Sequence, residues 1–126
     1  MQKIAVVTGG AKGLGRELVT FLANNGYTVA VHYNTSRQEA ESLLGEIKKF
    51  SSDSAIFSSN LKSGKDVLRF SKEVLAKYGN VDLLVNNVGN FLYKKFGNTT
   101  NEEFLDVIET NVFSTLFVSR AFLPAM

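Results

Sequence analysis

Four short runs of mostly apolar, often β-branched residues alternate with longer segments whose apolar residues recur every three or four positions. The short runs predict strands at 4–8, 28–33, 54–58 and 81–86, and the segments between and after them predict helices. Such alternation is typical of βαβ units, whose right-handed crossovers place helices on both faces of a parallel sheet. We therefore predict an α/β fold: a Rossmann-like doubly wound parallel sheet of about four strands, ordered 3-2-1-4, with flanking helices.

The first and last predicted helices each have an apolar face that we expect to be buried. In the first helix this face carries Leu14, Leu18, Phe21 and Leu22. In the last helix, which begins at the capping box of Thr100 and Glu103 and runs towards Pro124, the stripe comprises Phe104, Ile108, Thr115, Ser119 and Phe122.

Length and composition limit the class of protein. The 126 residues suffice for one domain, 1–126, and the 44% apolar and 21% charged residues are ordinary for a globular protein. A net charge of +2 gives no reason to expect nucleic acid or a membrane as partner. The chain has no cysteine, which excludes disulfides and thiolate metal sites, and its first residues contain no export signal. We therefore expect a cytoplasmic protein without a metal site.

The stretch "TGGAKGLG" (8–15) connects the first strand to the first helix. A helix N-terminus offers unpaired N–H groups and a positive dipole end, and glycine lets a phosphate approach them closely. Gly9, Gly13 and Gly15 have the spacing GxxxGxG instead of the commoner dinucleotide pattern GxGxxG. Arg16 and Glu17 follow where a P-loop needs Lys and Ser or Thr, which argues against ATP or GTP chemistry. The alternative is a glycine turn that serves only strand–helix packing.

Polar residues follow the fourth strand, at the point where the winding of the sheet reverses and ligands bind in such folds. In "NNVGN" we expect Asn87 and the backbone up to Gly89 to face the same crevice as the glycine loop, and one of the two leading amides to have a structural role. Asn111 lies on the apolar stripe of the last helix. We interpret it as a site residue, the alternative being a kink or a buried network.

The end of the second strand indicates which dinucleotide the chain prefers. An NAD site usually has an acidic residue there, but no Asp or Glu occurs between Leu18 and Gln38. Asn34 ends that strand, and the cations Lys12 and Arg37 could meet a 2′-phosphate. We therefore predict NADP in preference to NAD, the alternative being that both cations are solvated surface charges. We expect His32 to be a surface or strand-end residue, not a ligand or base.

Three ordered motifs resemble the classical type of the short-chain dehydrogenase/reductase family. "TGGAKGLG" is similar to TGxxxGxG, "NNVG" to NNAG with Val88 in place of alanine, and "ETNVFSTLFVSRAFLPAM" to the helix that carries the catalytic asparagine. The resemblance implies that Asn111 holds a proton-relay water. The cofactor contacts that it implies are Gly9, Gly13, Leu14 and Gly15 for the pyrophosphate, Lys12 and Arg37 for the 2′-phosphate, Asn60 and Leu61 for adenine, and Asn87, Val88 and Gly89 for the ribose. Asn60 stands where the family commonly has Asp, which alters that contact.

The chain departs from the family in its catalytic residues. The family uses a Tyr-x-x-x-Lys pair with a preceding serine, in which the lysine lowers the pKa of the phenol that donates the proton. None of the four tyrosines has a lysine four positions later, and the chain reaches Met126 before the family's serine would come. We therefore expect this chain alone to be inactive and its sheet to be incomplete relative to the family.

These observations predict an NADP(H)-binding oxidoreductase that transfers hydride between nicotinamide and a carbonyl, alcohol or enoyl substrate. The expected partners are the dinucleotide and, if a C-terminal half exists, a small-molecule substrate. The alternatives are a non-catalytic dinucleotide-binding or interaction module, or a truncated remnant. An apolar edge of the sheet at the fourth strand, or the last helix, could also form a homo-oligomer.

Overall fold

The computed structural model describes residues 2–126, in which strands and helices alternate as the sequence predicts. The first seven elements are β1 (Lys3–Val7), α1 (Gly13–Asn24), β2 (Tyr27–Tyr33), α2 (Arg37–Ile47), β3 (Ala55–Ser58), α3 (Gly64–Tyr78) and β4 (Leu83–Val85). The remainder comprises a 3-10 turn (Phe96–Asn98), α4 (Asn101–Ile108), a π turn (Glu109–Phe113), α5 (Ser114–Phe122) and a second 3-10 turn (Leu123–Ala125). The fourth strand is shorter than predicted.

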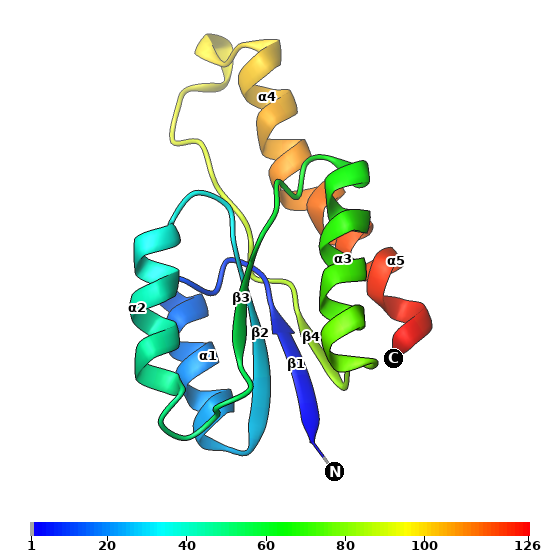
Figure 1. Ribbon diagram of the computed structural model, residues 1–126. Coiled ribbons are helices and arrows are strands. Elements are labelled where there is room, and N and C mark those ends of the chain that lie inside the picture. The colour runs from blue at the N-terminus through cyan, green and yellow to red at the C-terminus, as the bar shows by residue number, and fades with distance from the viewer. Residues whose placement is uncertain (1) are drawn as a thin grey trace.

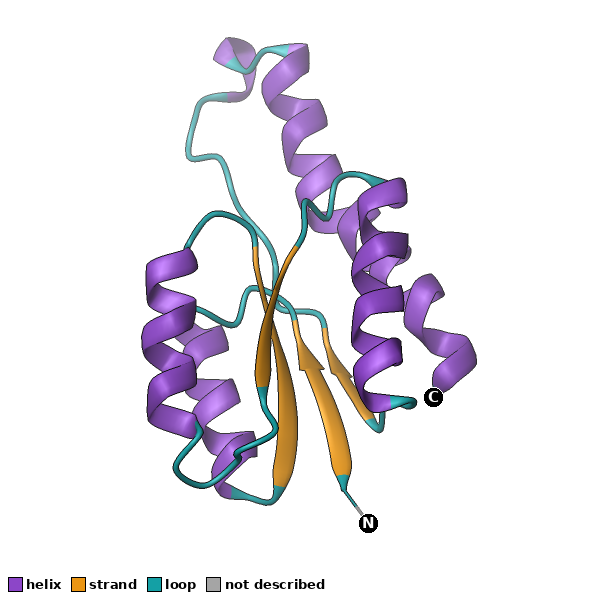
Figure 2. Cartoon of the chain, viewed as in Figure 1, coloured by secondary structure: helices purple, strands orange, loops and turns teal. Residues whose placement is uncertain are grey.

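The four strands form one parallel sheet in the order β3-β2-β1-β4, which confirms the predicted topology. In register, Val7 of β1 lies opposite Val31 of β2 on one side and Val85 of β4 on the other. Helices α1 and α2 cover one face of the sheet, and α3 and α5 cover the other (Figures 1 and 2). The carboxyl ends of all four strands therefore meet at one edge of the sheet.

Two apolar cores form because successive side chains of a strand point to opposite faces. Val7 and Val31 pack against α1 and α2. Val6, which precedes Val7 in β1, points to the other face and packs with Phe70 of α3 and Phe122 of α5. All five side chains are fully buried. Within residues 2–126, none of the helices combines the length and apolar character that a bilayer-spanning segment needs.

The predicted buried face of α1 was wrong in part: Leu22 is buried as predicted, but Leu14 and Phe21 are not. The buried residues are Gly15, Val19, Leu22 and Ala23. Leu14 and Phe21 are 69% and 62% exposed. A Cβ on Gly15 would lie 2.1 Å from the carbonyl oxygen of Gly9, so the helix approaches the glycine loop closely enough to require a residue without a side chain there. This contact turns the glycine inward and leaves the larger residues outside.

The predicted stripe of the last helix was also wrong in part. The buried residues of α5 are Ser114, Val118 and Phe122, whereas Phe104 and Thr115 are exposed. The π turn inserts an extra residue into one turn, which rotates the helix after it relative to the helix before it. In addition, α4 projects beyond the sheet (Figure 1), so that none of its residues is buried.

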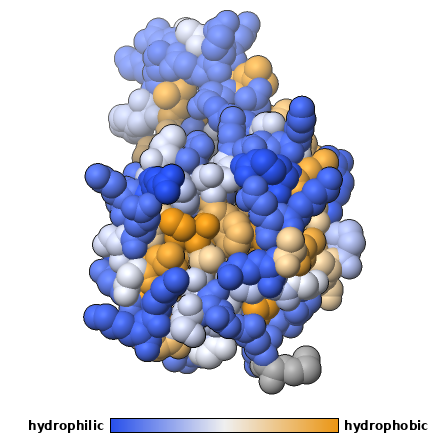
Figure 3. All heavy atoms as spheres, viewed as in Figure 1, coloured by the Kyte–Doolittle hydropathy of each residue, from blue (hydrophilic) through white to orange (hydrophobic). Residues whose placement is uncertain are grey.

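The edge of the sheet at β3 is partly open. The space-filling view in Figure 3 looks onto the side of the molecule that carries β3. Apolar side chains gather near its centre, and polar side chains surround them (Figure 3). Ala55, Ile56 and Phe57 of β3 are half-buried, as are all three residues of β4 at the opposite edge. Both edge strands are short, which limits the unpaired backbone that each exposes.

Candidate functional site

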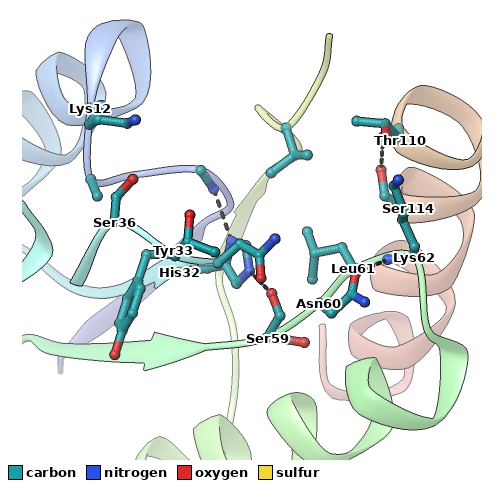
Figure 4. A pocket seen from close by; sticks show the side chains of 15 residues that line it. Lys12, His32, Tyr33, Ser36, Ser59, Asn60, Leu61, Lys62, Thr110 and Ser114 are labelled. Carbon is teal, nitrogen blue, oxygen red and sulfur yellow. Dashed lines mark hydrogen bonds between the residues drawn. The ribbon is translucent and has the colours of Figure 1, made fainter. Parts of the chain in front are cut away.

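A cavity of about 270 Å³ lies at the carboxyl ends of β1, β2 and β3, where the loop after β4 and the π turn close it from one side (Figure 4). Six of the residues predicted from the sequence line this cavity: Gly9, Lys12, Asn34, Asn60, Leu61 and Val88. The other seven lie outside its lining: Gly13, Leu14, Gly15, Arg37, Asn87, Gly89 and Asn111. The sequence therefore pointed to the end of the sheet that carries this cavity.

Lys12, the residue just before α1, lines this cavity, and the first turn of α1 has the geometry of an anion site. Gly13 has a φ of +57°, which favours glycine, and a Cβ built there would meet nothing within 4 Å. Lys12 is the N-cap of α1, and its side chain makes no capping hydrogen bond. The N–H groups of the first turn have no intrahelical partners, so the absence of a side-chain cap leaves them available to an anion. This loop therefore fits the phosphates of a dinucleotide.

Thr8 and Asn87 join the glycine loop to the segment after β4. The Thr8 hydroxyl oxygen accepts hydrogen bonds from the N–H groups of Asn87 at 2.9 Å and Val88 at 3.3 Å. The Asn87 side-chain amide donates to the carbonyl oxygen of Gly9 at 3.2 Å. Asn87 thus holds the glycine loop at Gly9. Thr8, which the sequence analysis did not include among the site residues, joins the end of β1 to the segment after β4. The position of Thr8, between the first strand and Gly9, could have indicated this role.

Asn111 lies in the π turn and holds the segment Gly89–Asn90. Its Oδ1 accepts from the N–H of Asn90 at 3.1 Å, and its Nδ2 donates to the carbonyl oxygens of Val107 at 2.8 Å and Asn90 at 2.9 Å. A Cβ on Gly89 would lie 2.8 Å from Asn111 Oδ1, so only glycine allows this approach. π turns often occur at functional sites because they re-aim side chains within a helix. The neighbouring Asn86 donates to Ser119 at 3.1 Å instead.

His32 lies at the end of β2, as one form of the prediction had it, but it is buried and is not a surface residue. Only 1% of it is exposed. Its Nδ1 accepts from the N–H of Gly9 at 3.0 Å, and its Nε2 lies 2.9 Å from the carbonyl oxygen of Ser59 (Figure 4). Burial lowers the pKa of His32, while the hydrogen bond to Ser59 and the charge of Asp66 oppose that shift. A histidine that directly follows the apolar run Val29–Val31 in the strand "YTVAVHY" was the signal for an internal partner.

The segment after β3 is held by Asp66 of α3. Its carboxylate accepts from the N–H of Asn60 at 2.7 Å and pairs with Arg69 at 2.8 Å. The Arg69 guanidinium and the Asn60 N–H lower the pKa of Asp66 from an ordinary 3.8 to about 2. Lys62 of the same segment forms an ion pair with Asp106 of α4. These contacts fix Asn60 and connect the cavity wall to α4.

The two predicted cations differ in position. Lys12 lines the cavity, and in the described residues 2–126 it forms no ion pair (Figure 4). Arg37 pairs with Glu41 at 2.8 Å, and its side chain is 73% exposed. Ser36, the N-cap of α2, lines the cavity on the same side as Lys12 (Figure 4) and makes no capping hydrogen bond with its side chain. Ser36 was not among the site residues that the sequence predicted.

A parallel sheet in the order 3-2-1-4, with a glycine loop and a cavity at its carboxyl edge, defines a Rossmann-fold protein. The sequence profile described as short chain dehydrogenase matches residues 3–126. The chain therefore belongs to the short-chain dehydrogenase family, a family of oxidoreductases.

Two curated reductases are similar to this chain. A 3-oxoacyl-[acyl-carrier-protein] reductase, FabG, of Staphylococcus epidermidis is 39% identical over 112 residues, which are 89% of this chain and 46% of that protein. Tetrahydroxynaphthalene reductase of Pyricularia oryzae is 34% identical over 94% of this chain and 42% of its own length. The chain thus spans less than half the length of these relatives.

Solved structures agree with the fold. An alcohol dehydrogenase from the archaeon Thermococcus sibiricus, complexed with 5-hydroxy-NADP, has a TM-score of 0.91 and 30% identity over 99% of this chain and 53% of its own. A dehydrogenase/reductase from Sinorhizobium meliloti has a TM-score of 0.94 over 98% of this chain and 49% of its own. At 24% identity, the second similarity concerns the fold alone.

Proposed function

We propose that this chain binds NADP(H) and is the cofactor-binding half of an oxidoreductase that acts on a carbonyl, alcohol or enoyl substrate. The observation that carries the proposal is the first turn of α1, whose N–H groups lack a side-chain cap beside the open Gly13 position. The loop residues just before this turn, Ala11 and Lys12, line a cavity at the carboxyl edge of the sheet, where dinucleotides bind in this class of fold. When bound, the nicotinamide supplies or accepts the hydride.

The polar groups of the cavity favour the phosphorylated dinucleotide. Lys12 supplies a cation that no carboxylate of the described residues neutralises, and the hydroxyl of Ser36 can donate to a phosphate oxygen. Asn34, at the end of β2, is neutral where an NAD site usually has a carboxylate. Arg37 would reach the same phosphate only by leaving Glu41. Lys12 is therefore the principal candidate for the 2′-phosphate contact.

The other predicted contacts are assigned by their positions. Asn60 and Leu61 line the wall that would face adenine, and Val88 lines the wall nearest β4. Gly13, Leu14 and Gly15 form the first turn of α1, while Asn87 and Gly89 support the loop and the π turn. By the family resemblance Asn111 would hold the proton-relay water, and its side chain holds the Gly89–Asn90 segment beside that position. The serine and Tyr-x-x-x-Lys pair that would donate the proton are absent from these 126 residues.

Fluorescence titration with NADPH tests the proposal through a matched pair of glycines. Gly13 and Gly26 both have positive φ and no atom within 4 Å of a built Cβ, but only Gly13 borders the anion site. Gly13→Val is expected to abolish NADPH binding because the side chain would fill the phosphate position. Gly26→Val has a similar backbone strain and is expected to retain the affinity of the unaltered chain. Equal affinities of all three proteins would contradict the proposal.

The 2′-phosphate assignment has its own test. Lys12→Ala is expected to weaken NADPH binding about tenfold and to leave NADH binding unchanged, because only NADPH has the phosphate that the cation contacts. Arg37→Ala should have a smaller effect of the same sign, and Lys72→Ala, on the surface of α3, serves as the charge-matched control. Equal losses for NADPH and NADH would remove Lys12 from the 2′-phosphate. No NADPH oxidation with carbonyl compounds is expected from this chain alone.

A further inference from the structure

His32 lies beneath the glycine loop, at the point where three strand ends meet. It belongs to the end of β2, and its ring contacts the N–H of Gly9 after β1 and the carbonyl oxygen of Ser59 after β3. The ring of Phe70, 5.3 Å away between centroids, packs against it from α3. The cavity assigned to the cofactor borders both His32 and Gly9 (Figure 4).

The two hydrogen bonds determine the protonation state of the ring. A backbone N–H can only donate, so the Nδ1 that faces Gly9 must lack a proton. A carbonyl oxygen can only accept, so the Nε2 that faces Ser59 must carry one. Only the neutral Nε2–H tautomer satisfies both partners. A second proton, on Nδ1, would place two donors face to face.

We propose that His32 is the positioning residue of the glycine loop: its neutral ring holds Gly9 and the turn into α1 in the phosphate-binding arrangement, and protonation at Nδ1 releases them. Gly9 has a φ of +60°, and its carbonyl oxygen accepts from Asn87, so the ring holds the peptide group before Gly9 and the Asn87 amide holds the one after it. The consequence for cofactor affinity rests on the function proposed above.

The surroundings set the direction of the pH effect. Asp66 of α3 is the charged group near the ring, and its carboxylate is itself paired with Arg69. The remaining neighbours are the Gly9 amide, the Ser59 carbonyl and hydroxyl, and the apolar ring of Phe70. Burial lowers the pKa of His32 below its ordinary value of 6.5 and outweighs the opposing effects of Ser59 and Asp66. The loop is therefore held at pH 7 and above, and is released only as the pH falls through the lowered pKa of His32.

Two isosteric substitutions separate the hydrogen bond to Gly9 from the packing of the ring. In His32→Asn the amide oxygen can take the place of Nδ1 and accept from Gly9 without titrating. In His32→Gln the longer amide reaches the position of Nε2, towards Ser59, and leaves the Gly9 N–H without its acceptor. A residue that only fills space would respond similarly to both changes.

The experiment combines NMR of the cofactor-free chain with NADPH titrations at pH 8 and pH 5. We expect the ¹⁵N shifts of the His32 ring to report the Nε2–H tautomer at pH 8, and the Gly9 amide resonance to move with the titration of that ring. We expect the unaltered chain to lose NADPH affinity at pH 5 in proportion to the fraction of His32 rings that the NMR titration shows to be protonated there. We expect His32→Asn to retain its affinity at both pH values, and His32→Gln to bind about tenfold more weakly at pH 8.

The two arms distinguish this proposal from the proposed function. A Gly9 resonance that does not follow the ring overturns the role of His32, and so does equal NADPH affinity of the Asn and Gln variants. One outcome is that the unaltered chain fails to bind NADPH at pH 8 while the Gly9 resonance follows the ring. In that case the proposed function is wrong, and the role of His32 in holding Gly9 is retained. The NMR arm uses the unaltered chain, so it remains decisive if a variant fails to fold.

Discussion

Residues 90–113, which we call the arm, and the rest of the described chain, the body, are stabilised in different ways. The body buries Phe70 and Phe122 completely between the sheet, α3 and α5. The structure describes every residue of the arm, and none of its side chains is buried. Tyr93 and Phe96 are 97% and 89% exposed. Figure 1 shows the arm projecting beyond the carboxyl edge of the sheet.

Polar contacts compensate in part for the missing burial in the arm. Thr100 and Glu103 form a complete capping box at the start of α4, and Lys94 pairs with Glu103 at 2.8 Å. Asp106 connects the arm to Lys62 of the body. The wall of the cavity that the body forms therefore rests on a packed core. The wall near the arm is stabilised by a helix cap and ion pairs. We expect the arm to open locally at a lower free energy than the body.

The largest effect is expected from Phe122→Ala, which leaves a cavity between α5 and Phe70. The free energy of unfolding should fall by about 3–5 kcal/mol. Phe96→Ala removes the same side chain from the arm, where it is exposed, and should change stability by less than about 0.5 kcal/mol. Urea denaturation measures both. Similar losses would show that the arm is packed as tightly as the body.

Gly15→Ala should destabilise the body by about 3 kcal/mol, because the new Cβ would overlap the backbone of Gly9. Gly45→Ala is the matched control, since a Cβ on this exposed residue of α2 meets nothing within 4 Å. The control should stabilise the chain by up to about 1 kcal/mol. Thermal unfolding distinguishes them, and a stable Gly15→Ala protein would refute the close approach of α1 to the loop.

Asp66→Asn tests the electrostatic part of the body. Because the pKa of Asp66 is about 2 in the folded chain and 3.8 ordinarily, its carboxylate stabilises the fold above pH 4, and this contribution is lost as the pH falls towards 2. We expect the substitution to cost about 1 kcal/mol at pH 7, a value reduced by solvent screening, and less at pH 3. Urea denaturation at both pH values is the measurement. A cost that is the same at both would contradict the assignment.

Thr100→Ala removes the cap of α4 and should destabilise that helix by about 1 kcal/mol. Amide hydrogen exchange in α4 should become about fivefold faster. Thr99→Ala is a neighbouring control outside the cap, because the Thr99 hydroxyl donates to the carbonyl oxygen of Lys95 instead. Unchanged exchange in α4 would mean that the capping box does not limit the opening of the arm.

The smallest effect is expected from Lys62→Met, which removes the ion pair with Asp106 between arm and body. Both side chains are exposed, so salt already weakens their attraction. We expect exchange in α4 to accelerate slightly at low salt, and the difference from the unaltered chain to disappear at high salt. A difference that persists at high salt would indicate a role for Lys62 other than charge.

The motifs predicted the sheet order and the end of the sheet that carries the cavity, because strand periodicity and glycine spacing are local properties of the chain. The same reasoning failed for α1, where Leu14 and Phe21 were predicted inside. It failed also for His32, a strand residue whose two partners are 23 and 27 positions away. Propensity and periodicity contain no information on such distant contacts.

The sequence by itself determined the family, the alternation of strands and helices, and the placing of glycines where α1 begins. Only the tertiary structure decided that α1 turns its glycine inward, that Lys12 lines the cavity while Arg37 pairs with Glu41, and that His32 holds Gly9. The physical reason is that a helical face, an ion pair and a buried tautomer each depend on which atoms approach across strands. Those distances arise only when the sheet assembles.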